Sequence, residues 1–148
     1  MAQTVQTIIN RKGAEVVTIT PAATLGKAAA LLASHNIGAV VVSDDGETVA
    51  GILSERDIVR RFASDEGVAT SSVSVAATMT SDVHVAGPDT SIDDLMQTMT
   101  THRVRHVPVV ADGKLTGIVS IGDVVKNRMD ELEIQAKSLK EYVTGSSY

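Results

Sequence analysis

The sequence has no cysteine and no tryptophan, and its 148 residues include only one phenylalanine and two tyrosines. Without cysteine the chain can form no disulfide, thiolate nucleophile, thiolate zinc site or iron–sulfur cluster. With aromatic residues at 2%, the core must be built from Val, Ile, Leu, Ala and Met. Scarce aromatic rings and a net charge of −5 also oppose nucleic-acid binding, which relies on stacking and on basic side chains.

Long apolar runs are absent as well. None approaches the ~20 residues that cross a bilayer, and the first residues lack the basic and apolar regions of a signal peptide. We therefore expect a cytoplasmic protein that has neither a membrane nor a nucleic acid as its partner. Hydrophobic residues still make up 43% of the sequence. A chain of this length buries roughly 70% of its unfolded surface, so it needs no metal or disulfide to fold.

What the sequence does contain is an internal repeat. Residues 16–63 align with residues 82–129, and Pro21 and Pro88 are 67 positions apart. The offset falls to 66 after the second copy loses one residue in a turn. Two copies of about 50 residues therefore fill most of the chain.

Each copy is expected to run strand, helix, strand, strand, helix, which gives an α/β (α+β) fold with a C-terminal helix. Apolar residues at i, i+3, i+4 and i+7 mark one helix in each copy, after the N-caps Thr24 and Ser91. β-Branched runs around an Asp-Gly turn predict a hairpin, and a second helix follows it. The expected hairpin strands are Ile37–Val42 with Val49–Leu53, and Val104–Val110 with Leu115–Val119. The expected domains are residues 1–65 (first repeat with its lead-in), 66–130 (linker and second repeat) and 131–148 (C-terminal helix and tail).

The sharpest motif is Gly-h-h-Ser-x-x-Asp, where h is an apolar residue, at residues 51–57 and again at 117–123. A serine at a helix start with an aspartate three residues later is close to a capping box, and capping alone can explain the pair. The alternative is a ligand site, because a helix N-terminus presents N–H groups that suit a phosphate. A carboxylate in the first turn can also accept hydrogen bonds from both hydroxyls of a ribose. The recurrence of the pair in both copies favours the ligand site.

A second candidate is the segment His-Arg-Val-Arg-His-Val-Pro at residues 102–108, where a helix is expected to pass into a strand. The first copy has no such basic cluster. These side chains form either a solvated charged face or an anion site, since the arginine fork matches a phosphate. Zinc binding by His102 and His106 is disfavoured, because the expected strand begins between them. We expect no metal site, and no arrangement of residues argues for catalysis.

Taken together, these residues resemble a known family. Two copies of h-x-h-x-P, an amphipathic helix, I-G-A-V-V-V or V-R-H-V-P-V-V, D-G and G-h-h-S-x-x-D are similar to tandem cystathionine-β-synthase (CBS) domains, a pair called a Bateman module. The resemblance covers about residues 5–130 and is greatest to small stand-alone bacterial proteins made of one CBS pair. It implies two β-α-β-β-α repeats packed as a pseudo-two-fold pair. It also implies a regulatory module that binds an adenosine compound in two clefts between the copies, without catalysis or a required cofactor. The expected ligands are AMP, ATP or NAD, with ADP and S-adenosylmethionine also in the family's range.

The resemblance also implies which residues of this sequence contact the ligand. The serines and aspartates implied to contact ribose or phosphate are Ser54, Asp57, Ser120 and Asp123. The strand after the first helix is implied to line the base pocket, and each cleft to combine this strand of one copy with the Ser-x-x-Asp of the other. These segments are Ile37, Gly38 and Ala39 in the first copy and Val104, Arg105 and His106 in the second. Arg56 is a candidate phosphate contact, and Gly122 stands in its place in the second copy, so the two clefts are expected to be unequal.

A ligand-independent scaffold or interaction protein with a CBS fold is the alternative to a nucleotide sensor. Intact Ser-x-x-Asp in both copies favours ligand binding. An enzyme is disfavoured, because no Walker loop, dinucleotide fingerprint or nucleophile motif occurs in the sequence. The sequence names neither the nucleotide nor a downstream protein partner.

The end of the chain carries a second apolar stripe. Its members are Val125, Met129, Leu132, Ala136, Leu139 and Val143. They recur every 3.5 residues, which predicts a terminal helix running to about Val143. Such a stripe either packs on its own domain or forms an interface. Because CBS pairs commonly form homodimers, the resemblance implies a homodimer with this helix at or near the interface.

Overall fold

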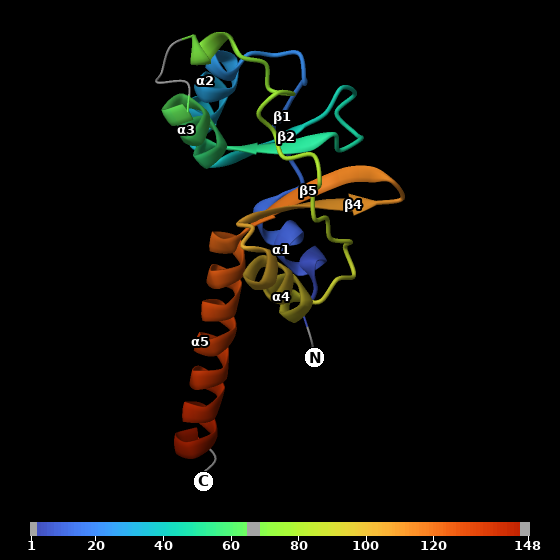
Figure 1. Cartoon of the computed structure of the whole chain (residues 1–148). Helices are drawn as coiled ribbons and strands as arrows, with labels where there is room; N and C mark the ends of the chain where they lie inside the picture. Colours follow the sequence, from blue (N-terminus) through green and yellow to red (C-terminus); the bar gives the residue numbers. More distant parts are fainter. Residues whose placement is uncertain (1–2, 65–68, 146–148) are drawn as a thin grey trace.

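Two short β-sheets form the centre of the molecule. The computed structural model describes residues 3–64 and 69–145. Helices of the first copy lie on one side of the sheets, helices of the second copy and of the N-terminus lie on the other, and the last helix extends away from this body (Figure 1). The boundary expected between residues 65 and 66 lies outside the described residues, and the expected domain limits stay predictions.

The first copy has the expected order of elements. It consists of β1 (Thr18–Ile19), α2 (Leu25–His35), β2 (Ala39–Val42), β3 (Gly51–Ser54) and α3 (Glu55–Ser64). β1 pairs in parallel with β2, and β2 pairs antiparallel with β3. All four residues of β2 are buried, because this central strand is covered on both faces.

The second copy repeats this order with one difference. It consists of α4 (Ile92–His102), β4 (His106–Ala111), β5 (Lys114–Ser120) and α5 (Ile121–Gly145). The strand expected before α4 is reduced to a single bridge between Ala86 and Val109. Pro108 stands where the first copy has Val41 and has no N–H to donate to that strand, so the pairing stops after one residue.

The helix starts predicted from Thr24 and Ser91 are confirmed. Each hydroxyl oxygen accepts a hydrogen bond from the backbone N–H three residues later, at 3.2 Å for Thr24 and 3.0 Å for Ser91. Both helices also end alike, since Asn36 and Arg103 have left-handed backbone with φ of 52° and 55°. This cap turns the chain from each helix into the segment that leads to the next strand.

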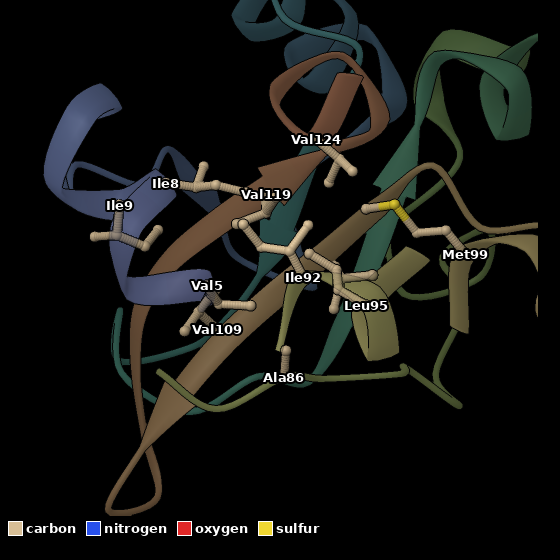
Figure 2. Close-up of a cluster of buried hydrophobic side chains, with 11 residues drawn as sticks. Val5, Ile8, Ile9, Ala86, Ile92, Leu95, Met99, Val109, Val119 and Val124 are labelled. Atoms are coloured by element: carbon tan, nitrogen blue, oxygen red, sulfur yellow. The ribbon is translucent and has the colours of Figure 1, made fainter. Parts of the chain in front are cut away.

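Each copy has its own apolar core of aliphatic side chains, as the lack of aromatic residues required. The core of the first copy contains Ile19, Leu25, Ala28, Leu32, Val40, Val42, Leu53 and Val75. Figure 2 shows the core of the second copy, which includes Ile92, Leu95, Met99, Val109, Val119 and Val124.

A helix at the N-terminus, α1 (Val5–Lys12), was not predicted from the sequence. It precedes the first copy but packs against β5 and α5 of the second, where Val5, Ile8 and Ile9 are buried in the core (Figure 2). These three residues are separated by three positions and by one, which places them on one side of a helix, and this spacing could have indicated α1. It is short, and Thr4 gives it no side-chain cap, so the signal in the sequence was weak.

The glycine that opens each Gly-h-h-Ser-x-x-Asp motif lies under a crossing segment of chain. A Cβ atom on Gly51 would lie 2.6 Å from the sulfur of Met79 and 2.8 Å from the carbonyl oxygen of Thr80. A Cβ atom on Gly117 would lie 2.5 Å from Cδ1 of Ile9 in α1. The motif therefore begins with glycine because another part of the chain packs directly on the backbone there.

We expect Gly51→Ala to lower the free energy of unfolding by about 1–3 kcal/mol, the usual range for overpacking a core position. Gly117→Ala should cost less, because only the flexible end of Ile9 has to move, whereas Gly51 also faces the backbone of Thr80. The loss of chain entropy in the unfolded state acts equally on both variants and cancels in the comparison. Denaturant unfolding of the two proteins measures the difference, and equal losses would contradict it.

The outer part of α5 is largely exposed. Val124 and Asn127 are buried, whereas the predicted stripe is exposed along its length, with Val125 49%, Met129 59%, Leu132 55%, Leu139 64% and Val143 67% exposed. Packing of this stripe on its own domain, one of the two expectations, is therefore wrong. The stripe forms one side of a helix that runs unbroken from Ile121 to Gly145 (Figure 1).

No helix within residues 3–64 and 69–145 is both long and apolar enough to cross a membrane.

Candidate functional site

The two Ser-x-x-Asp pairs form capping boxes. The N–H of Ser54 donates to Oδ2 of Asp57 at 2.9 Å, and the N–H of Asp57 donates to the hydroxyl of Ser54 at 3.2 Å. Ser120 and Asp123 form the same pair of bonds at 2.9 and 3.1 Å. Capping and ligand binding are compatible, because an ionised carboxylate accepts about four hydrogen bonds and the cap uses one of them.

Each capped helix start is tied to the strand segment beside it. The N–H of Glu55 donates to the carbonyl of Gly38 at 2.9 Å, and the N–H of Ile121 donates to the carbonyl of Arg105 at 2.8 Å. These bonds join equivalent positions in the two copies. They fix the distance between the carboxylate and the segment that leads into β2 or β4.

A cavity between the copies, which we call cleft 1, has a volume of about 520 Å³. It brings together two sets of predicted site residues, Ser54, Arg56 and Asp57 from the first copy with Val104, Arg105 and His106 from the second. Gly38 and Ala39 also line it. The cavity thus has the arrangement across the copies that the family resemblance implied.

The second cavity, cleft 2, has a volume of about 370 Å³. It brings Ser120 and Asp123 of the second copy together with Ile37, Gly38 and Ala39 of the first. His106 lines this cleft as well as cleft 1, so its imidazole belongs to the wall between the two cavities.

Cleft 1 is rich in cations. Four arginines line it, namely Arg56, Arg60, Arg103 and Arg105, against the carboxylates of Glu55, Asp57 and Asp82. His84 lies at the same cavity and stacks on His102, with ring centroids 3.9 Å apart. Guanidinium groups present paired donors that suit phosphate oxygens.

The sequence analysis did not assign Arg60, Arg103 or His84 to the site. Arg60 lies four residues after Arg56 and therefore on the same side of α3, a spacing that could have indicated it. Arg103 belongs to the basic segment at residues 102–108, for which the sequence allowed two interpretations, a solvated charged face or an anion site. The structure places that segment at the cavity.

Cleft 2 has a different charge arrangement. The ammonium of Lys12, from α1, donates to Oδ2 of Asp123 at 2.7 Å and to the carbonyl of Ile118 at 2.8 Å. Burial by itself raises the pKa of Asp123, but the bonds from Lys12 and Ser120 outweigh it, so the pKa lies below its ordinary value. The carboxylate is therefore fully ionised and already paired.

The environment of His106 favours the neutral form of its ring. Burial lowers the pKa of His106 below its ordinary value, and the Lys12 ammonium lowers it further, against the opposing carboxylates of Asp123 and Glu55. A neutral imidazole can both donate and accept a hydrogen bond, which suits contacts with a neutral base or hydroxyl.

Within residues 3–64 and 69–145, no group of three His, Asp or Glu side chains is placed to hold a metal ion.

Comparison with known proteins identifies the family. The CBS domain model matches residues 5–64 and again residues 73–130. The protein therefore belongs to the CBS domain family and consists of two tandem CBS repeats, which confirms the resemblance and the fold class predicted from the sequence.

Similar proteins include both stand-alone and longer ones. The chain is 37% identical over 118 residues to the mitochondrial CBS domain-containing protein CBSX3 of Arabidopsis thaliana, covering 77% of this chain but only 57% of that protein. The crystal structure of the CBS-domain protein ATU1752 from Agrobacterium tumefaciens is 47% identical, with a TM-score of 0.81, and covers 85% of this chain and 99% of that chain. The CBS domain pair of protein MJ0100, solved in complex with 5′-methylthioadenosine and S-adenosyl-L-methionine, is 25% identical with a TM-score of 0.74, covering 84% of this chain and 98% of that chain.

Proposed function

We propose that this protein is a regulatory sensor that binds an adenine nucleotide and does no chemistry on it. The observation that carries the proposal is cleft 1, where the carboxylate of Asp57 and four guanidinium groups are among the groups that line a cavity of about 520 Å³. That volume lies in the range of small-molecule sites. The complex of the related MJ0100 pair with two adenosine compounds supports an adenosine ligand.

Each part of the ligand has a chemical counterpart in cleft 1. Asp57 would accept hydrogen bonds from the two ribose hydroxyls while its Oδ2 keeps the cap on α3. Arg56 and Arg105 would bind phosphate oxygens. The backbone around Val104 and the ring of His106 would face the base. The proposed ligands are AMP, ADP or ATP, NAD, and S-adenosylmethionine.

For the same reason, we expect cleft 1 to bind ligands that carry phosphate groups with higher affinity than cleft 2. A hydrogen bond to a charged group contributes roughly 1.5–3 kcal/mol, so each arginine that contacts a phosphate can change affinity by about tenfold or more. The proposal requires no cofactor and no metal, and it places the protein in the cytoplasm, where these nucleotides occur.

We further propose that the protein is a homodimer joined through the exposed stripe of α5, with a downstream protein as the recipient of the signal. The stripe supports a second copy as its occupant because it repeats every 3.5 residues and is self-complementary in a coiled coil. The same stripe also supports the second candidate function, a scaffold or interaction protein that needs no ligand.

Thermal unfolding of ligand-stripped protein tests the sensor proposal. We expect the Tm to rise with ATP more than with AMP, and with AMP more than with adenosine, because the number of phosphate groups facing the arginines decreases in that order. A ligand at 100 times its Kd adds about 2.7 kcal/mol of stability, which is a shift of several degrees for a domain of this size. If no adenosine compound shifts the Tm at millimolar concentration, the sensor proposal fails and the scaffold takes its place.

A further inference from the structure

The two aspartates that are equivalent in the repeat have different partners. Within the described ranges 3–64 and 69–145, the carboxylate of Asp57 accepts one hydrogen bond, from the N–H of Ser54, and has no ion-pair partner. The carboxylate of Asp123 receives the ammonium of Lys12 at 2.7 Å in addition to its cap from Ser120. The side chains of Lys12 and Asp123 are only 31% and 25% exposed, so the pair is partly shielded from water.

The repeat itself explains this difference. Met79 follows Lys12 by 67 positions, which is the offset between Pro21 and Pro88. In the first copy Met79 packs on Gly51, the first residue of the Gly-h-h-Ser-x-x-Asp motif. In the second copy Lys12 bonds to the carbonyl of Ile118, which follows the equivalent glycine, Gly117. A thioether carries no charge, so the first copy has no cation at the place where the second has an ammonium.

We propose that Lys12 closes cleft 2 to adenosine ligands by holding the carboxylate of Asp123, so that the chain binds one nucleotide, in cleft 1. This inference rests on the proposed function, because it assumes that Asp57 and Asp123 are the groups that hold a ribose. Lys12 acts as an internal competitor of the ribose.

Competition follows from the chemistry of the two partners. The ammonium of Lys12 and the N–H of Ser120 both bind Oδ2 of Asp123, so a ribose diol that is to use both carboxylate oxygens has to displace Lys12, and its neutral hydroxyls do not replace the lost ion pair. The bond from Lys12 to the carbonyl of Ile118, at 2.8 Å, holds the ammonium at the carboxylate from a second side. The bond from Lys12 joins two opposite charges between partly buried groups, whereas a bond from a ribose hydroxyl has an ionised acceptor only, so the exchange is unfavourable for a neutral diol.

Removing the ammonium should therefore open cleft 2. We expect isothermal titration of ligand-stripped wild-type protein with AMP to show one equivalent per chain. Lys12→Met keeps the length of the side chain and removes its charge. It should bind a second equivalent of AMP, with an affinity at least about tenfold above the upper limit that the wild-type titration sets for cleft 2. Lys27→Met is the matched control, since Lys27 is an exposed lysine on α2 that lines neither cleft, and it should show one equivalent.

Two further measurements fix the interpretation. Adding Asp123→Ala to Lys12→Met should remove the second equivalent, which assigns it to cleft 2. Without ligand, the pKa of His106 followed by NMR should rise in Lys12→Met, because the Lys12 ammonium lowers it. The same spectra show whether the variant is folded.

The outcomes separate this inference from the proposed function. Two equivalents in wild-type protein, or one equivalent in both wild-type and a folded Lys12→Met, would overturn the role of Lys12 and leave the sensor intact. If wild-type protein and all variants bind neither AMP nor any other adenosine compound, the sensor proposal and the role of Lys12 are overturned together.

Discussion

Asp57→Ala is expected to abolish nucleotide binding at the concentrations where wild-type protein is saturated. The substitution leaves two ribose hydroxyls without their acceptor in a partly enclosed cleft, and each lost bond to a charged group costs roughly 1.5–3 kcal/mol. The two lost bonds together amount to about 3–6 kcal/mol, so affinity should fall by roughly two to four orders of magnitude. The fold should persist, because losing the cap that Asp57 shares with Ser54 costs only about 0.5–2 kcal/mol.

Asp94→Ala is a matched control for this experiment. Ser91 and Asp94 form the same serine-to-aspartate spacing at the start of α4, and Asp94 lines neither cleft. The N–H of Asp94, and not its carboxylate, bonds to the hydroxyl of Ser91, so this variant should lose little helix-start stability and should keep its affinity for ATP.

A change in the ligand isolates the role of the carboxylate. 2′,3′-Dideoxy-ATP retains the base and the phosphates and lacks both ribose hydroxyls. Wild-type protein should bind it more weakly than ATP, whereas Asp57→Ala should bind the two alike, because the group that reads the diol is gone. Calorimetric titration measures all four affinities. An undiminished preference for ATP in Asp57→Ala would mean that another residue holds the ribose.

The double variant Leu132→Glu/Leu139→Glu is expected to be monomeric at micromolar concentration, where we expect the wild-type protein to be dimeric. Both leucines lie on the exposed stripe of α5, at equivalent positions one heptad apart. A buried leucine contributes roughly 1.5–3 kcal/mol, and a dimer would lose four of them and place four like charges at one seam. Light scattering gives the mass of each protein.

Ile134→Glu/Ser138→Glu introduces the same charge on the other sides of α5. Ile134 is 59% exposed, but it lies two residues from Leu132 and so points away from the stripe. This variant should remain dimeric. A monomeric wild-type protein would remove the dimer proposal, and a dimer that survives both glutamates on the stripe would remove α5 from the interface.

The features that the sequence predicted well depend on short separations along the chain. Thr24 and Ser91 cap their helices through bonds that span three residues, as do the capping boxes at Asp57 and Asp123. Such bonds need only the local backbone to form, and they recur wherever the same residue types stand at the same spacing.

The first strand of the second copy was predicted from the sequence repeat, and this prediction is wrong. The two copies align in sequence, yet this strand is a single bridge at Ala86. The deciding residue is Pro108, which lies on the neighbouring strand β4 and cannot donate a hydrogen bond to it. A strand depends on its neighbour for its hydrogen bonds, so its own sequence does not fix its length.

By itself, the sequence determined the two-copy architecture, the caps of the helices and the position of one carboxylate at each capped helix start. The tertiary structure alone decided that α1 lies on the second copy, that Arg60 joins cleft 1 and that Lys12 pairs with Asp123, 111 positions away. The physical reason is range: helix caps and turns arise from neighbours within four residues. The charge at each cleft depends on which distant segment packs over it, and apolar burial of Val5, Ile8 and Ile9 brings Lys12 there.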